Sequence, residues 1–286
     1  MKENLGNARN TASIIKQYGF SFQKRFGQNF LIDEHVLNKI IDASLVEEND
    51  GVIEIGPGIG TMTQRLCERA KKVVAIEIDK ELIPILSDTL SEYSNVKVIN
   101  ADVMKTDLAE LIGEEFSGMR VRVVANLPYY ITTPIVMNLL EQQLSIESIT
   151  IMVQKEVAER MQAQPGTKDY GALSLAVGYY ADTYIAANVP PNCFMPRPKV
   201  GSSVIRLSVR KEPKVSVHDE RLMFGLIRAA FNQRRKTLVN AIANFKELSI
   251  TKNEVESALQ KMGLDTNIRG EVLDLSQFAV LSDLLT

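Results

Sequence analysis

A polar and aromatic stretch, Asn126-Leu127-Pro128-Tyr129-Tyr130, directly follows the apolar run 121–125. A short apolar run bounded by a proline-containing segment is typical of a buried parallel strand, and residues just past such strands form the ligand crevice of an open α/β sheet. These residue types suit the exocyclic amine of a nucleobase, whose lone pair is delocalised into the ring. The carbonyls of Asn126 and Pro128 are candidate acceptors for the amine hydrogens, and Tyr129 or Tyr130 is the candidate stacking ring. A turn that packs its aromatics onto the sheet explains the stretch equally well, so other residues must decide.

A glycine-rich loop, EIGPGIGT over residues 54–61, lies at the first predicted strand-to-helix junction. Glycines there let the backbone approach a ligand closely and turn sharply into the helix. The loop lacks the GxxxxGK[ST] pattern of phosphate-cradling ATPases. It suits an adenosyl cofactor without a pyrophosphate at least as well as NAD, with Gly56 and Gly58 as candidate contacts.

Acidic residues end the next two predicted strands. Glu77 follows Gly56 by 77 − 56 = 21 residues, a spacing that suits a ribose diol. Asp102 ends the third strand and is a candidate acceptor for an adenine amino group. Read singly, Glu77 is an ordinary surface acid. Four successive strand ends nevertheless present glycine, acid, acid and then Asn126 at one sheet edge, which favours a binding site.

The elements that must position these residues follow from the apolar pattern. Strands are expected at 52–55, 73–78, 96–100, 121–125 and 148–153, with further β-like patterns at 183–189 and 203–209. Helices are expected from the Asp33 cap through Ile41, and at 61–70, 80–93, 107–112, 134–142, 155–162 and 173–180. This alternation predicts an α/β fold, a mostly parallel sheet with helices on both faces.

The pattern changes to helices alone beyond about residue 210, at 219–243, 252–262 and 276–284. We therefore expect three parts: a basic N-terminal arm over 1–32, an α/β domain over 33–210, and a small all-α domain over 211–286. The boundary is expected near Lys211-Glu212-Pro213.

Composition bounds the class of protein. The chain has 286 residues, 45% of them hydrophobic, which is enough for one large core and a second, smaller one. Cys67 and Cys193 lie far apart without metal-ligand spacing, so neither a disulfide framework nor a metal site is expected. The sequence shows neither a signal peptide nor an apolar stretch of the ~20 residues that cross a bilayer. We expect a cytoplasmic protein without membrane contact.

Charge is segregated although the net charge is only −2. Residues 192–236 hold eleven bases against three acids, and the first 32 residues hold five bases against one acid. A solvated helix face explains a lone basic run. Two basic blocks flanking one candidate site favour a surface that faces a polyanion. The bases of the longer block are Arg197, Lys199, Arg206, Arg210, Lys211, Lys214, Arg221, Arg228, Arg234, Arg235 and Lys236.

Together, the loop 54–60, Glu77, Asp102 and the stretch 126–129 resemble the S-adenosylmethionine-dependent adenine-N6 methyltransferases. More narrowly, the chain resembles the ribosomal RNA adenine dimethylase family along almost its full length. The resemblance implies a Rossmann-like class I methyltransferase sheet and S-adenosyl-L-methionine as cofactor. Residues 27–31, GQNFL, match the family segment that closes over the methionine end of the cofactor. The implied cofactor contacts are Asn29, Leu31, Gly56, Gly58, Glu77, Asp102 and Asn126.

The resemblance extends to residues 194–204, FMPRPKVGSSV. It implies that Phe194 sandwiches the target adenine against Tyr129, and that Lys199 lies near the RNA backbone. It assigns no such role to Tyr130, which is then expected to be a core residue. From its residues alone, the segment is better explained as a proline-rich loop anchored by one buried aromatic, Phe194.

Segments 228–238, 268–271 and 276–278 resemble the small-subunit branch of the family. On a continuous helix, Arg234, Arg235 and Lys236 would fan around more than half of the circumference and, with Arg228, contact RNA phosphates.

The implied reaction dimethylates N6 of two adjacent adenosines near the 3′ end of small-subunit ribosomal RNA, within an immature 30S particle. The implied enzyme is a monomer without a metal. His35 and His218 lie outside every motif, so no general base is expected. Three rivals stay open: a large-subunit adenine methylase, a DNA adenine methylase, and an assembly factor whose RNA binding matters more than turnover.

Overall fold

The computed structural model describes residues 5–286, so Lys2 of the basic arm lies outside the described residues, as does the side chain of Lys24. The chain forms two compact units. The sheet unit comprises the chain as far as Ala158 together with Thr183–Val209, and the helical unit comprises Glu159–Asp182 together with Arg210–Thr286.

Seven strands form the sheet in the order β4-β3-β2-β5-β6-β9-β7. Neighbours from β4 to β6 are parallel, and β9 runs antiparallel to β6, which confirms the mostly parallel sheet. The bounds are β2 Gly51–Ile55, β3 Lys72–Glu77, β4 Val96–Asn100, β5 Val121–Asn126, β6 Ile146–Gln154, β7 Ala181–Val189 and β9 Ser202–Val209.

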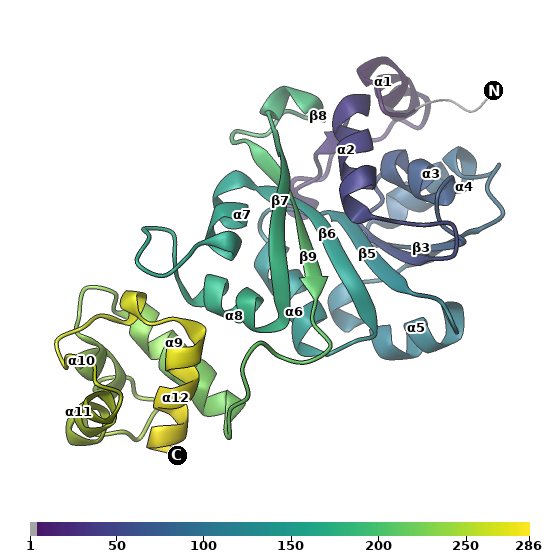
Figure 1. Ribbon diagram of the computed structural model, residues 1–286. Coiled ribbons are helices and arrows are strands. Elements are labelled where there is room, and N and C mark those ends of the chain that lie inside the picture. The colour runs from purple at the N-terminus through teal and green to yellow at the C-terminus, as the bar shows by residue number, and fades with distance from the viewer. Residues whose placement is uncertain (1–4) are drawn as a thin grey trace. The chain divides into compact units, whose positions relative to one another are not determined.

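Helices cover both faces of this sheet, with α2 in front of it and α6 behind it (Figure 1). The helix predicted over 80–93 is shorter: a 3₁₀ turn at Lys80–Leu82 leads into α4, which ends at Thr89. The helices that begin in this unit are α1 Ala8–Gln17, α2 Glu34–Ser44, α3 Thr61–Cys67, α4 Ile83–Thr89, α5 Leu108–Glu115, α6 Thr132–Glu141 and α7 Lys155–Gln162.

The core explains why these residues fold in this way. Every residue of β2 is buried, including Glu54, as its central place in a parallel sheet requires. Asp33 caps α2 as predicted, because its carboxylate accepts the Val36 N–H at 3.0 Å. The apolar faces of α2 and α3 pack with Val52 and Val73 in one cluster.

The N-terminal arm folds onto the sheet unit through three aromatic rings. Phe30 lies 5.9 Å from Phe20 and 5.2 Å from Phe22 between ring centroids, and the cluster packs with Leu82 and Leu86. A two-residue strand, β1 Phe30–Leu31, pairs antiparallel with β8 Phe194–Met195. The arm is therefore an integral wall of the sheet unit.

The helical unit is built from α8 Ala172–Tyr180, α9 Glu220–Asn232, α10 Leu238–Ala243, α11 Lys252–Lys261 and α12 Leu275–Leu285. The prediction of one helix over 219–243 is wrong. Helix α9 ends at Asn232, a turn follows, and the Thr237 side chain caps α10. The unit also differs from the predicted range 211–286, because 159–182 group with it through contacts of α8 with α9 and α12.

Candidate active site

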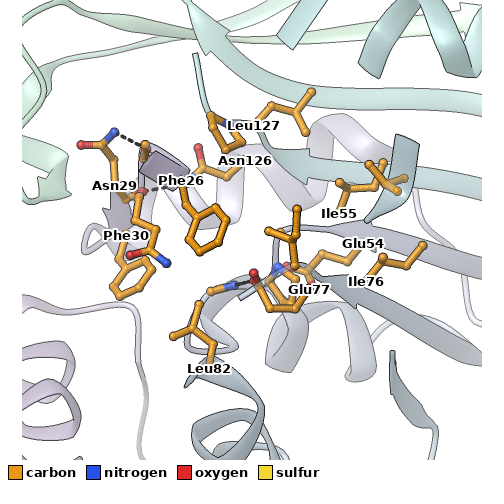
Figure 2. Close-up of a pocket in the computed structure, with 18 of the residues that line it drawn as sticks. Phe26, Asn29, Phe30, Glu54, Ile55, Ile76, Glu77, Leu82, Asn126 and Leu127 are labelled. Atoms are coloured by element: carbon orange, nitrogen blue, oxygen red, sulfur yellow. Dashed lines mark hydrogen bonds between the residues drawn. The ribbon is translucent and has the colours of Figure 1, made fainter. Parts of the chain in front are cut away.

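A cavity opens at the carboxyl ends of β2, β3 and β5. Strands β3 and β4 lie on one side of β2 and β5 lies on the other, so the strand order reverses at this point, where open α/β sheets bind ligands. Figure 2 shows side chains from the arm, β2, β3 and β5 around it. The predicted site residues that line it are Asn29, Leu31, Gly56, Gly58, Glu77, Asp102, Asn126, Pro128 and Tyr129.

The glycine loop uses backbone conformations that other residues rarely adopt. Gly56 and Gly58 have φ angles of +71° and +61°. A Cβ atom on Gly58 would lie 3.0 Å from the Phe30 ring, so the arm packs directly on the loop. The Gly58 N–H donates to Oε2 of Glu77 at 3.2 Å. The loop is thus fixed between the arm and β3.

The carboxylate of Glu77 is buried in the cavity wall, and backbone N–H groups hold it in place. Its Oε1 accepts the Asp79 N–H at 2.8 Å, and the Gln28 amide of the arm donates to Asp79 at 2.7 Å. Burial raises the pKa of Glu77 to about 7. Each carboxylate oxygen can accept a second hydrogen bond, so both remain suited to ribose hydroxyls.

Asp102 lies two residues beyond the end of β4, which is Asn100, and not in the strand as predicted. Its Oδ1 accepts the Met104 N–H at 3.0 Å and caps the 3₁₀ turn Val103–Lys105. The Lys105 ammonium lies 4.0 Å from Oδ2. Since the side chain also lines the cavity, it is placed to meet a ligand amino group.

Glu54 is a cavity residue whose side chain the sequence analysis missed. It is fully buried on β2, and neither carboxyl oxygen has a hydrogen-bond partner in the described chain. Burial raises its pKa to about 8; the nearby Thr63 hydroxyl, too far away or poorly aligned for a standard hydrogen bond, opposes this rise, and the charge of Glu77 adds to it. The available signal was one acid in an otherwise apolar strand, Gly51-Val52-Ile53-Glu54-Ile55.

The charge of the cavity selects among cofactors. Glu54, Glu77 and Asp102 line it, whereas the described residues contribute no lysine, arginine or histidine to its lining. An acidic, base-free cavity disfavours the phosphates of NAD or ATP and suits a cationic ligand. The residues present therefore fit S-adenosylmethionine, which carries a sulfonium, an ammonium and a ribose diol.

Asn126 has a fixed amide orientation at the end of β5. Its Nδ2 donates to the Asn29 carbonyl of the arm at 3.0 Å (Figure 2). This leaves the side-chain carbonyl oxygen available as an acceptor, and its contact with the substrate amine stays a prediction. The Pro128 carbonyl instead already accepts the Ile131 N–H at 3.2 Å and the Thr132 hydroxyl at 3.1 Å. Both of its acceptor positions are used, which disfavours the role predicted for Pro128.

The two tyrosines differ in environment. The Tyr129 hydroxyl lies 2.7 Å from the Ser202 hydroxyl, which holds the half-buried ring at the cavity wall. Tyr130 is 61% exposed, so the expectation that it is a core residue is wrong. Its ring lies 3.3 Å from where a Cβ atom of Gly27 would be, and it borders the cavity beside the arm.

Phe194 does not line the cavity. Its side chain is 3% exposed and packs in the cluster that contains Leu31 and Val204. The structure thus shows the buried anchor of a proline-rich loop. Stacking of Phe194 on a target base stays a prediction, and it requires the ring to leave this core.

The predicted RNA contacts are spread over a loop, helix α9 and the turn that follows it, rather than along one helix. Lys199 is exposed between β8 and β9 in the sheet unit, and Arg228 is exposed on α9 in the helical unit. Arg234, Arg235 and Lys236 lie in the turn between α9 and α10. Arg234 is tied down there, 3.2 Å from Glu271 and 3.1 Å from the Lys168 carbonyl.

Over residues 5–286, no group of three or more histidine, cysteine, aspartate or glutamate side chains is arranged to hold a metal ion. Within the same residues, no helix is long and apolar enough to cross a membrane.

Comparisons with known proteins agree with this geometry. A family model described as ribosomal RNA adenine dimethylase matches residues 19–281. Ribosomal RNA small subunit methyltransferase A of Lachnoclostridium phytofermentans is 59% identical over 98% of this chain and 97% of that protein. The protein of the same name from Geobacillus thermodenitrificans is 51% identical over 100% of this chain and 98% of that protein.

Two solved structures are also similar to this chain. A dimethyladenosine transferase from Plasmodium falciparum has a TM-score of 0.73 at 27% identity, covering 88% of this chain and 95% of that one. The 23S rRNA methyltransferase ErmE has a TM-score of 0.68 at 26% identity, covering 90% and 99%.

A mostly parallel sheet with a glycine loop and strand-end acids around an acidic cavity defines an S-adenosylmethionine-dependent methyltransferase. S-adenosylmethionine is the methyl donor of this enzyme. Within that class, the chain belongs to the ribosomal RNA adenine dimethylase family.

Proposed function

We propose that this enzyme dimethylates N6 of two adjacent adenosines near the 3′ end of small-subunit ribosomal RNA. We choose the small subunit because of the sequence identity to known methyltransferases. The chain is 59% identical to a small-subunit methyltransferase over nearly its full length, but 26% identical to the 23S enzyme ErmE. The methyltransferase site itself does not distinguish small-subunit RNA from 23S RNA as substrate. The higher sequence identity along the whole chain favours small-subunit RNA.

The site residues support amine methylation by positioning and polarisation. S-adenosylmethionine, when bound, supplies an electrophilic methyl group. Asn126 offers its side-chain carbonyl to an amine hydrogen, because its NH₂ is committed to Asn29. Leu127 lines the cavity, and its backbone carbonyl accepts no hydrogen bond from the described residues, so it replaces the Pro128 carbonyl as the candidate second acceptor.

Stacking would hold the flipped base for this reaction. Tyr129 borders the cavity next to Asn126, and its hydroxyl contact to Ser202 restrains the ring. A target adenosine must leave its stack to reach such a pocket, and an aromatic platform offsets part of that cost. We assign the platform role to Tyr129 and the phosphate contacts to Lys199, Arg228, Arg234, Arg235 and Lys236.

The partner and compartment follow from this function. We infer that the substrate is an immature small-subunit particle, that the enzyme acts as a monomer, and that it works in the cytoplasm. The exposed bases support contact with structured RNA, whose phosphates such side chains position without reading sequence.

Labelled S-adenosylmethionine tests the proposal. The protein is incubated separately with immature small-subunit particles, large-subunit RNA and duplex DNA, and the labelled nucleosides are identified. We expect N6-dimethyladenosine from the small subunit alone. Exclusive labelling of the large subunit or of DNA would overturn the assignment. RNA binding without any transfer would instead favour an assembly factor.

A further inference from the structure

Tyr130 lines the cavity and is also 61% exposed, so its ring lies at the border between the cavity and solvent. Among the described residues it is the most exposed large hydrophobic side chain. Tyr129, the other ring of the same turn, is half-buried, and its hydroxyl contacts that of Ser202. One cavity therefore has an inner and an outer aromatic ring, and the platform proposed for the target base is the inner ring alone.

The backbone of the arm restrains the outer ring. A Cβ atom on Gly27 would lie 3.3 Å from Cδ1 and 3.4 Å from Cε1 of Tyr130, so one edge of the ring packs against Gly27. Gly27 has a φ of +58°, in the left-handed region that glycine adopts readily. Most of the Tyr130 surface stays exposed in spite of this contact. A ring that is already held in place loses less freedom when a ligand stacks on it.

The arm also places a cation close to the cavity mouth. Arg25 is exposed, and its guanidinium carbon lies 4.6 Å from the centroid of the Phe26 ring. Phe26 lines the cavity (Figure 2) and directly precedes Gly27. Arg25 makes no ion pair with the described residues, so its charge is available to a phosphate. Exposed aromatic rings beside available bases are the groups with which proteins hold unstacked nucleotides.

The nucleotide next to the target adenosine needs such a surface. A target base reaches a cavity of this kind only after it has left its stack. The base beside it then has one face without a neighbour. An aromatic ring can replace the lost neighbour whatever the sequence, because every base has a π face. Tyr129 and Tyr130 are consecutive residues with Cα atoms about 3.8 Å apart, so the two rings are within reach of consecutive nucleotides.

We propose that Tyr130 forms a second base-binding site, on which the nucleotide adjacent to the target adenosine stacks while the target occupies the cavity. Arg25 lies beside this site and contacts the flanking phosphate. The occupant is a nucleotide of the RNA rather than part of the cofactor, because an exposed ring near a cation suits a polyanion, whereas the cavity interior is acidic. This inference rests on the proposed function, since it requires an RNA substrate with an extruded adenosine.

Removal of single bases from the RNA tests the site. Because the two adenosines lie near the 3′ end, a synthetic segment in which one of them is abasic can be ligated to the remaining RNA before particle assembly. The other adenosine is then the single target, and the two abasic RNAs lack the 5′ and the 3′ neighbour in turn. The quantity measured is kcat/KM of methyl transfer with respect to RNA.

Tyr130→Ala should lower kcat/KM on intact RNA by about five- to tenfold, as expected for the loss of one stacked base. On one of the two abasic RNAs, wild type and Tyr130→Ala should differ by less than about twofold, because the base that stacks on Tyr130 is already absent. The RNA that shows this coupling identifies the side on which the neighbour stacks. An equal deficit of Tyr130→Ala on all three RNAs would overturn the proposal, and would be the result if Tyr130 stacked on the target base itself.

Two control variants separate the ring from other effects. Tyr130→Phe keeps the ring and should transfer methyl groups at close to the wild-type rate. Tyr184→Ala removes a tyrosine of β7 that is 54% exposed and does not line the cavity, and it should behave as wild type on all three RNAs. Calorimetric titration without RNA should give Tyr130→Ala the S-adenosylmethionine affinity of wild type. A matching loss of cofactor affinity would contradict a site for RNA.

The failure of this inference can be told from the failure of the proposed function. Transfer by wild type to intact small-subunit particles tests the function, whereas the difference between the abasic RNAs tests the Tyr130 site. Should Tyr130→Ala fail to fold, a 4-thiouridine at the flanking position probes the wild-type protein. Ultraviolet light is then expected to crosslink it to Tyr130, and crosslinks to other residues alone would refute the site.

Discussion

Asn126 joins two tasks in one side chain. Its NH₂ group holds the arm through the Asn29 carbonyl, and its oxygen is the proposed acceptor for an amine hydrogen of the substrate. This division explains why an amide suits the position better than a carboxylate, which would have no hydrogen to donate. Removal of the side chain therefore affects transfer more directly than RNA capture.

We expect Asn126→Ala to slow methyl transfer by about 10²–10³-fold, the effect typical of removing one group that stabilises developing charge. RNA affinity should change little, because Asn126 is not among the residues proposed to contact phosphates. Single-turnover transfer and RNA binding, measured on the same preparations, separate the two effects. Asn253→Ala on the exposed surface of α11 serves as control. Unaltered transfer by Asn126→Ala would refute amine polarisation.

Tyr129 offers a test in which the ring and the hydroxyl are separated. Tyr129→Ala removes the proposed platform, and stacking is worth about 1–3 kcal/mol per base. Tyr129→Phe keeps the ring and removes only the hydrogen bond with Ser202. Transfer rates at saturating cofactor should fall steeply for alanine and only a few-fold for phenylalanine. Equal reductions in the two variants would show that the hydroxyl, rather than the ring, matters.

Strand-end side chains were the residues most predictable from sequence. Gly56, Glu77, Asp102 and Asn126 meet at one cavity because parallel strands end at a common edge. The engagement of the Pro128 carbonyl depends on how the following turn closes, and the burial of Phe194 depends on packing between distant segments. Neither property has a local sequence signal.

At the scale of elements, the cavity wall depends on a contact between the arm and the glycine loop. The Phe30 ring fills the space where Gly58 lacks a side chain. The loop and the arm are therefore in direct contact, which links the cofactor site to the N-terminal aromatic cluster.

Gly58→Ala should weaken S-adenosylmethionine binding and lower the free energy of unfolding. The left-handed backbone costs about 1–2 kcal/mol for a residue with a Cβ atom, and the contact with Phe30 adds to it. Gly118→Ala is the matched control, because Gly118 has a φ of +73° but no neighbour within 4 Å among the described residues. Calorimetric titration and denaturant unfolding check both. Equal destabilisation by the two variants would contradict a packing role for Phe30.

Elements with strong periodicity were predicted well, and those fixed by distant partners were not. The parallel strands and α2 carry their own apolar pattern and cap. The pairing of β1 with β8 joins segments that lie at opposite ends of the sheet unit's sequence, so local pattern cannot reveal it. The break between α9 and α10 arises because Thr237 caps a new helix inside a sequence that otherwise favours helix.

At the scale of the whole molecule, acidic and basic residues lie in different regions. The cavity carries acids, whereas the residues proposed to meet RNA are exposed bases. The acidic cavity thus suits the cationic cofactor, and the exposed bases suit the anionic RNA. Binding of RNA should consequently depend on salt, and binding of the cofactor should depend on it far less.

Arg235→Ala should lower RNA affinity and reduce the slope of log affinity against log salt by about 1 if Arg235 binds a single phosphate. Stability should be unaffected, because Arg235 is exposed and makes no ion pair within residues 5–286. Arg234→Ala should lower both RNA affinity and stability, since Arg234 anchors the turn to Glu271. Salt-series binding and thermal unfolding distinguish the pair. An unchanged salt slope for Arg235→Ala would exclude it from the interface.

The helical unit is discontinuous in sequence, which limits how it can be exchanged between relatives. Helix α8 belongs to it and contacts α9 and α12, although a stretch of the sheet unit separates α8 from them along the chain. A graft made at residue 211 alone would give α8 of one parent the α9 and α12 of another. To transfer the whole helical unit between relatives, both of its segments, Glu159–Asp182 and Arg210–Thr286, must be exchanged together. Substitutions in one segment must therefore stay compatible with the other.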